Sequence, residues 1–208
     1  MKAMMPTASD PHWNVFVTNP AIYVDASRLA ACFGDAIAVP SCQLMLDTPR
    51  LARRLSALLA SQFRLAPLAG DLEGEDRRIA LAPKGDIEDM AMHAGAICWS
   101  ASLAGTIGKE VVSAIHRQIG EELFDFALAN RDIAVPPRPL EPLETLTVRM
   151  RDDGWRCIAA WYRAVPEPLS AWLKVKVPVG IDLDAEPMAS GAAIVRRASE
   201  ALQRGPAQ

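Results

Sequence analysis

The feature that most constrains the fold is a stretch of 19 residues, Met90–Gly108, that contains no Asp, Glu, Lys or Arg. A segment of this length without charge belongs either in a bilayer or in a protein core. Its only strong aliphatic residues are Ile97, Leu103 and Ile107, and Gly, Ser, Thr and His dilute them. Since one such residue contributes only about 0.3–0.6 kcal/mol to membrane insertion, three cannot drive it. The stretch therefore predicts a buried core helix and no membrane insertion.

Charge returns after Gly105-Thr106 in a pattern typical of an amphipathic helix. Apolar residues recur at steps of four, so they line one face of a helix. Gly120 lies inside this pattern and costs about 1 kcal/mol relative to alanine, which indicates a kink, a break or close contact with another helix. The apolar positions are Ile107, Val111, Ile115, Ile119 and Leu123.

The rest of the chain shows helical spacing between segments rich in glycine and proline. We predict an all-α fold with at most a minor pair of short strands, in a single helical domain that covers residues 1–208. Asp86 is expected to cap the charge-free helix, and Asp152-Asp153-Gly154 to separate two helices. The other helices are expected at 27–33, 48–63, 143–151, 155–165 and 189–203, and residues 174–178 are expected to be extended or to end a helix. We also expect a loose loop at 66–85, a proline-rich connector at 132–142 and a flexible tail at 179–208 that includes the last of these helices.

Composition and charge exclude several classes of partner. The formal net charge is −3 and the isoelectric point is near 5.7, whereas nucleic-acid-binding domains normally carry a basic surplus. The first residues contain no continuous apolar segment of a secretory signal. The four cysteines are far apart and form no CxxC pair, so we expect no disulfide framework and a reducing, cytoplasmic compartment. We expect no nucleic-acid partner.

No catalytic or metal-binding motif stands out. The three histidines form no HxxxH pair, and His93 is interpreted as a hydrogen-bonded core residue. The segment 105–109 is similar to a phosphate-binding loop, but Glu110 replaces the magnesium-binding hydroxyl and would repel phosphate. Glu121 and Asp125, one turn apart, are interpreted as a solvated helix face and not as an acid–base pair. We therefore expect no catalytic residue, no metal ligand and no cofactor.

Aromatic and basic residues gather in the last third of the chain, where three of the five tryptophans lie within residues 155–172. Tryptophan and arginine are over-represented at interaction hot spots, and they are also ordinary core and rim residues. This region is where we expect a docking surface. The candidate partner-binding residues are Arg149, Arg151, Arg156, Trp161 and Trp172.

Three segments, taken in order, resemble the SctK family, also called YscK, OrgA or NolU, of type III secretion proteins. Residues 20–29 (PAIYVDASRL) resemble the family's opening of an aromatic residue, a short polar stretch and leucine. The Ala/Gly-rich helix at 93–103 leads to IGEELFDFAL at 119–128, which is similar to the family's Gly-acidic helix ending in Phe-Ala-Leu. The last similar block contains GWRC, VP and LKVKVP at 154–157, 165–166 and 173–178.

The resemblance covers residues 14–178. Asp25-Ala26 departs from it, because many relatives have a His-Pro pair there. The tail beyond Gly180 lies outside it.

The resemblance implies a non-enzymatic adaptor, because SctK-like proteins are helical, cytoplasmic components of the sorting platform of the injectisome. They link the cytoplasmic domain of the inner-membrane ring protein SctD to the pod protein SctQ. SctQ in turn connects to the stator SctL and the ATPase SctN. The resemblance therefore implies a role in protein transport and virulence, at the cytoplasmic face of the bacterial inner membrane.

Other functions compete with this interpretation of the sequence. A type III secretion chaperone would be shorter and would show clear strands, which this sequence lacks. A helix-turn-helix regulator would need a basic recognition helix, yet residues 120–130 are acidic and would repel phosphate. Another helical interaction module, or an enzyme whose active site is assembled from distant residues, also fits the composition.

Overall fold

The computed structural model describes residues 18–34, 36–65 and 74–204. Within these ranges the chain forms helices and no strand, which confirms the all-α prediction. The α-helices are α2 (Ala26–Cys32), α3 (Val39–Leu46), α4 (Ala52–Gln62), α5 (Gly74–Leu81), α6 (Lys84–Ala104), α7 (Lys109–Ile119), α8 (Glu121–Ala129), α9 (Leu146–Ala164), α10 (Glu167–Lys176) and α11 (Gly191–Arg204). The 3-10 helices are η1 (Pro20–Ile22), η2 (Pro49–Leu51), η3 (Arg131–Ile133) and η4 (Leu143–Thr145).

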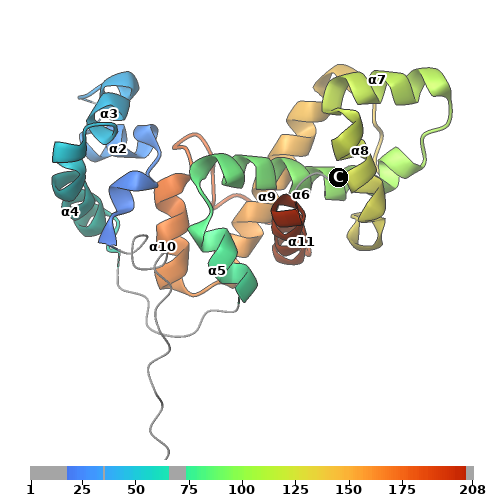
Figure 1. Ribbon diagram of the computed structural model, residues 1–208. Coiled ribbons are helices and arrows are strands. Elements are labelled where there is room, and N and C mark those ends of the chain that lie inside the picture. The colour runs from blue at the N-terminus through green and yellow to red at the C-terminus, as the bar shows by residue number, and fades with distance from the viewer. Residues whose placement is uncertain (1–17, 35, 66–73, 205–208) are drawn as a thin grey trace, which may run out of the picture.

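Helices α6 and α9 pack against each other at the centre of the molecule (Figure 1). Two glycines let their backbones touch. A Cβ atom added to Gly95 would lie 1.9 Å from the carbonyl oxygen of Met150, and one added to Gly154 would lie 1.8 Å from that of Ala91. Both distances are far inside van der Waals contact, so this packing requires glycine at both positions.

Gly154 therefore does not separate two helices. The prediction of a break at Asp152-Asp153-Gly154 is wrong, because α9 continues without interruption from Leu146 to Ala164. Glycine weakens an isolated helix by about 1 kcal/mol. Here the missing side chain permits dense contact with α6, which offsets that cost.

Helix α6 confirms the buried helix that the charge-free stretch predicts. Its residues Ala91, Ile97 and Leu103 are buried in the main hydrophobic cluster. The expectation that Asp86 caps this helix is wrong, because the helix begins earlier, at Lys84. No helix in the described ranges combines the length and the hydropathy that a membrane crossing requires.

The amphipathic segment that follows is divided at Gly120 into α7 and α8. Gly120 has a φ of +83°, a conformation that residues with a side chain rarely adopt, so the sequence-predicted break is confirmed. Ile115 is fully buried, but Ile107, the first apolar position of the expected stripe, lies in the turn before α7 and is 93% exposed.

Helix α5 lies inside the predicted loose loop at 66–85, so that prediction is wrong for residues 74–81, whereas α11 confirms the helix predicted at 189–203. Ile79 of α5 and Ile194 of α11 are fully buried. Asp76 joins both helices to α9, because it accepts hydrogen bonds from Trp161 Nε1 at 2.7 Å and from Arg196 Nε at 2.9 Å. Asp76 thus binds α5 to both α9 and α11.

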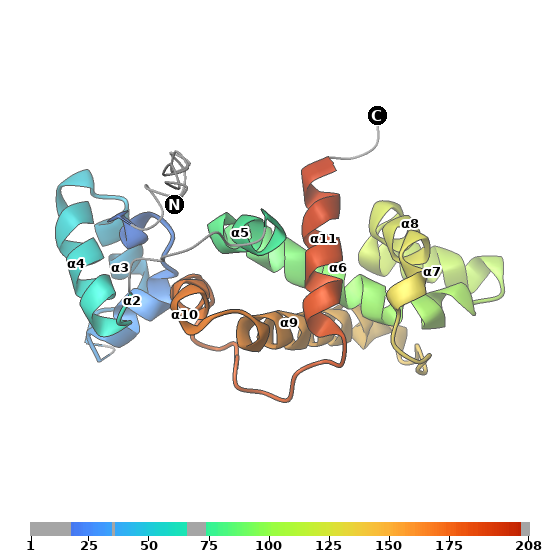
Figure 2. The same ribbon diagram turned by 90° about the horizontal axis from the view of Figure 1, so that it is seen from below.

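Residues 18–65 form an N-terminal unit with a second hydrophobic cluster. Leu29 of α2, Cys42 of α3 and Leu59 of α4 meet in this cluster and are fully buried. Figures 1 and 2 show the unit at one end of an elongated molecule, with α7 and α8 at the opposite end.

Helix α10 joins the N-terminal unit to the rest of the molecule. Its Val175 belongs to the N-terminal cluster, whereas its Leu173 belongs to the main cluster. Asp25 of the N-terminal unit forms a salt bridge with Lys84 of α6, in which Oδ2 lies 2.6 Å from Nζ. Arg28 Nε donates to the carbonyl oxygen of Val177 at 2.7 Å. Apolar and polar contacts therefore fix the position of the unit together.

Candidate functional site

The two candidate tryptophans lie in the core. Trp161 is fully buried and Trp172 is 2% exposed. The indole of Trp161 binds Asp76, as described above, and so helps to hold α5 against α9. Both side chains contribute to the stability of the fold, and neither forms part of an exposed surface in this structure.

Arg149 holds the proline-rich connector in place. Its guanidinium donates hydrogen bonds to the carbonyl oxygens of Pro139 at 3.1 Å, Pro142 at 2.9 Å and Leu140. The same group lies 4.8 Å from the centre of the Trp99 ring, within the range of a cation–π contact. Arg149 is therefore half-buried by its own connector.

Arg156 and Arg151 differ in their surroundings, although both lie on α9. Arg156 donates to the carbonyl oxygen of Glu186 at 3.1 Å and to Asp153 Oδ1 at 3.3 Å, so it ties the segment before α11 to α9. Arg151 is exposed. The five candidate residues consequently do not form one continuous surface: two are in the core, two secure loops and one faces solvent.

A buried polar cluster that the sequence did not predict surrounds Asp153. The carboxylate accepts a hydrogen bond from Trp99 Nε1 at 2.9 Å, and Arg138 and Arg156 approach it at 2.7 and 3.3 Å. The Arg138 guanidinium also lies 4.2 Å from the centre of the Trp99 ring. Charged hydrogen bonds of this kind compensate the cost of burying a carboxylate. The cluster joins α6, α9 and the connector, which identifies it as structural.

A second polar cluster surrounds Asp76, whose side chain is partly buried. Burial acts to raise the pKa of its carboxyl, but the hydrogen bonds from Arg196 and Trp161 and the charge of Arg196 outweigh burial and hold this pKa below its usual value. The carboxylate is thus held ionised and engaged by its partners. A group that already binds three donor atoms within the fold has little capacity left to act as an acid or a base.

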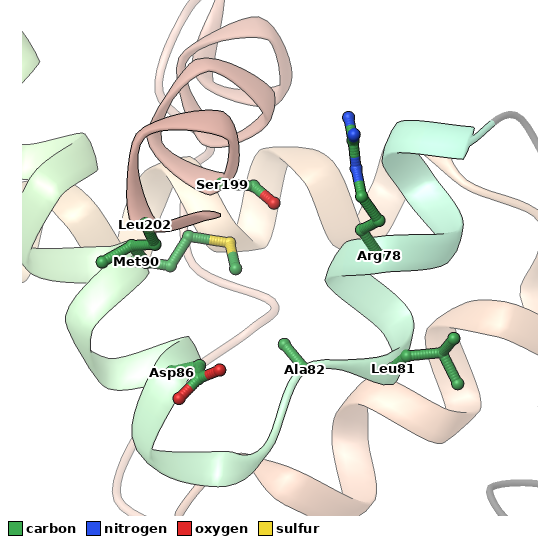
Figure 3. A pocket seen from close by; sticks show the side chains of 7 residues that line it. All are labelled: Arg78, Leu81, Ala82, Asp86, Met90, Ser199 and Leu202. Atoms are coloured by element: carbon green, nitrogen blue, oxygen red, sulfur yellow. The ribbon is translucent and has the colours of Figure 1, made fainter. Parts of the chain in front are cut away.

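The hollow drawn in Figure 3 lies between α5, α6 and α11 and has a volume of about 270 Å³. Arg78 and Asp86 contribute charge to its wall, while Met90, Ser199 and Leu202 line it from α6 and α11. Ser199 is its one hydroxyl, and no histidine stands beside it to activate a nucleophile. The hollow therefore lacks the base that serine catalysis requires.

The histidines and cysteines in the described ranges show no reactive arrangement. His93 is half-buried, with Nδ1 2.8 Å from the carbonyl oxygen of Asp89. Cys98 and Cys157 are buried free thiols with their sulfur atoms 3.4 Å apart. Their mutual hydrogen bond and burial raise the pKa of Cys157 far above its usual range, so its nucleophilic thiolate is suppressed. Among the described residues no group of side chains is placed to hold a metal ion.

Exposed surfaces at the two ends of the molecule are the remaining candidates for binding. At one end, η1, α3 and α4 expose Ile22, Leu44 and several arginines. At the other end, α8 exposes Glu121, Glu122 and Asp125, as expected for a solvated face. The sequence indicated the acidic face through its helical spacing, but it gave no signal that apolar residues of α3 stay exposed.

Comparison with known proteins supports the chain's resemblance to type III secretion proteins. A family model described as YOP proteins translocation protein K (YscK) matches residues 13–197. No curated protein and no solved structure matches the chain. The family match spans most of the 208 residues, including both hydrophobic clusters. The chain therefore belongs to the YscK family, which is the SctK family of type III secretion proteins.

Proposed function

We propose that this chain is a non-enzymatic adaptor of the injectisome sorting platform, which links the cytoplasmic domain of an SctD-like inner-membrane ring protein to an SctQ-like pod protein. Through the pod protein it is connected indirectly to SctL-like and SctN-like components. The observation that carries this proposal is the family match over residues 13–197. The location that we propose is the cytoplasmic face of the bacterial inner membrane.

The distribution of charged groups supports a role in binding over a role in catalysis. The ionisable side chains of Asp76, Asp153 and Lys176 are buried or partly buried, and all three bind groups elsewhere in the fold. In the described ranges, buried ionisable groups thus hold helices together, whereas an active site needs such groups in an accessible cleft.

The elongated arrangement also supports a linking role. The N-terminal unit and the α7–α8 pair lie at opposite ends of the molecule (Figures 1 and 2). An adaptor must bind two partners at once without steric conflict, and two well-separated ends meet that requirement.

Co-purification tests this function. The full chain carries an affinity tag and is produced with the SctQ-like protein and the SctD-like cytoplasmic domain of the same bacterium. We expect all three proteins to elute as one complex, and we expect the chain to be required for retention of the SctD-like domain with the SctQ-like protein. Binding of only one partner, or of neither, would contradict the linking function. In parallel, deletion of the gene should abolish type III secretion, and the wild-type chain should restore it.

A further inference from the structure

Helix α3 leaves two of its large apolar side chains exposed. Cys42 is the only fully buried residue of this helix. Leu44 is 69% exposed and Val39 is 45% exposed, and Ile22 on the neighbouring η1 is 60% exposed. Single exposed apolar residues are ordinary on a protein surface. These three, however, occur together within one small unit.

The same unit carries three exposed arginines on its η2–α4 segment. Arg50, Arg53 and Arg54 are exposed and follow one another at steps that place them on one face of the η2–α4 segment. The ion pairs found in the described ranges do not include them. They form a block of positive charge that no acidic side chain of the described structure neutralises.

The charge of the whole N-terminal unit has the same sign. Residues 18–65 contain five arginines and three aspartates, and no lysine or glutamate, although the complete chain has a net charge of −3. Asp25 is buried and paired with Lys84, which removes one of these aspartates from the surface. The N-terminal unit is thus a basic end on an acidic molecule.

The apolar and basic residues belong to elements that touch. Helix α3, which carries Leu44, contacts η2, and η1, which carries Ile22, contacts α4. The exposed arginines of η2–α4 and the exposed apolar residues of α3 and η1 thus belong to elements that contact one another within one small unit. We name this combination the α3–α4 surface, and define it by Ile22, Val39, Leu44, Arg50, Arg53 and Arg54.

We propose that the α3–α4 surface docks an acidic protein segment that carries apolar side chains beside its carboxylates. Interfaces of this composition place aromatic or aliphatic anchors beside arginine. Arginine binds carboxylates through paired, charge-assisted hydrogen bonds, and such charges also select the partner by rejecting basic ones.

A protein partner fits this surface better than an anionic membrane or a nucleic acid. Binding to phosphate polymers depends on a basic surplus over the domain, whereas the exposed face of α8, with Glu121, Glu122 and Asp125, adds negative charge at the other end. Leu44 and Val39 also have no counterpart in the phosphate backbone of a nucleic acid, which offers no apolar surface to cover them. The net charge of −3 on the complete chain opposes approach to an anionic bilayer.

This proposal deepens the proposed function and rests on it only for the choice of cell in which it is tested. The test places the photoreactive amino acid p-benzoylphenylalanine at Leu44 of the full chain, in the bacterium that produces it. A second variant carries the same group at Val148, an exposed residue of α9. After irradiation, mass spectrometry identifies the peptide linked to each position.

We expect Leu44 to link to a peptide rich in Asp and Glu, and Val148 not to link to it. The variant R50E/R53E/R54E should reduce the yield about tenfold or more, and lysine substitution of the carboxylates in the linked peptide should restore it. The matched control K109E/R117E/R151E changes the net charge equally at exposed positions elsewhere and should leave the yield unchanged. Melting temperatures equal to that of the wild type will show that the variants keep their fold.

Several results would overturn the proposal: no cross-link at Leu44, links only to phospholipid, to nucleic acid or to a second copy of this chain, or a yield that R50E/R53E/R54E does not change. The cross-linked peptide could also come from an acidic protein outside the secretion apparatus, with its yield restored by the lysine substitutions. That result would support docking at the α3–α4 surface and contradict the proposed adaptor function. The two proposals can therefore fail separately.

Discussion

Trp99 on α6 donates its indole N–H to Asp153 on α9 at 2.9 Å. This bond lies between the two central helices, and the carboxylate is also approached by Arg138 of the connector. A buried carboxylate without partners would be costly, so Arg138 of the connector and Arg156 of α9 both stabilise the carboxylate that accepts this bond. One aspartate thereby couples the central helix pair to a segment without regular structure.

Replacement of Asp153 by alanine should lower the free energy of unfolding by about 1–3 kcal/mol, because it leaves the Trp99 N–H without its acceptor and removes the partner of the arginines. Chemical denaturation measures this change. Asp152→Ala alters the neighbouring exposed position and should change stability by less than about 0.5 kcal/mol. Equal effects of the two variants would contradict the described role of Asp153.

Gly154→Ala tests the contact between α6 and α9. The new methyl group would overlap the Ala91 carbonyl group, and backbone cannot rotate away as a side chain can, so we expect a loss of about 3 kcal/mol or more. Gly85→Ala is the control, since no atom lies within 4 Å of a Cβ there. In that helical position alanine should be neutral or stabilise by up to about 1 kcal/mol. Thermal unfolding of both variants decides the comparison.

Replacement by Asp should affect the stability of the protein very differently at two isoleucines of the expected apolar stripe. Ile115 is fully buried and Ile107 is 93% exposed. Ile115→Asp places a charge in the core and should unfold the protein or reduce its stability by several kcal/mol, of order 3 or more. Ile107→Asp should leave the melting temperature nearly unchanged. Ile119, which is half-buried, should give an intermediate loss on replacement by Asp.

The pKa shift of Asp76 predicts a specific pH dependence. Its folded-state pKa lies below the usual value of 3.8 because the bonds from Arg196 and Trp161 outweigh the opposing effect of burial. A lowered carboxyl pKa stabilises the fold above the unfolded-state pKa, and this contribution is lost as the pH falls through the folded-state pKa. Wild type should therefore exceed Asp76→Asn in stability at pH 7, and the difference should narrow below about pH 4.

Urea denaturation at a series of pH values measures that difference. Asp89→Asn, at an exposed position of α6, is the control for the loss of one carboxylate. A difference between wild type and Asp76→Asn that stays constant down to low pH would contradict the shift.

The four cysteines should differ in their reaction with a thiol reagent. Cys42, Cys98 and Cys157 are buried and Cys32 is partly exposed, and burial raises the pKa of both Cys32 and Cys42. In the native protein we expect slow modification of Cys32 alone, because access and thiolate content limit the rate. All four thiols should react in denaturant. Loss of the native reaction in Cys32→Ser checks the assignment.

The sequence predicted those parts of the fold that depend on local pattern. The absence of charge identified α6, and Gly120 identified the division between α7 and α8, since both signals lie within single segments. Gly154 shows the limit of such reasoning: its role depends on Ala91, more than 60 residues away in the chain, and no local pattern distinguishes a helix break from a close contact.

The same limit applies to the candidate site. Trp161 and Arg149 have the composition of a binding surface, but tertiary partners engage both. Trp161 is buried in the main cluster and donates to Asp76 of α5, a helix that was not predicted because charged residues and glycine dominate its sequence. The exposure of Leu44 is equally a tertiary result, because it depends on which helices happen to cover α3.

Helix α10 contributes Val175 to one hydrophobic cluster and Leu173 to the other, and its buried Lys176 donates to the Ala80 and Ala82 carbonyl oxygens at the end of α5. A pulling force applied to the N-terminal unit would thus be transmitted through this helix, together with the ion pair between Asp25 and Lys84 of α6, into the interior of the larger body.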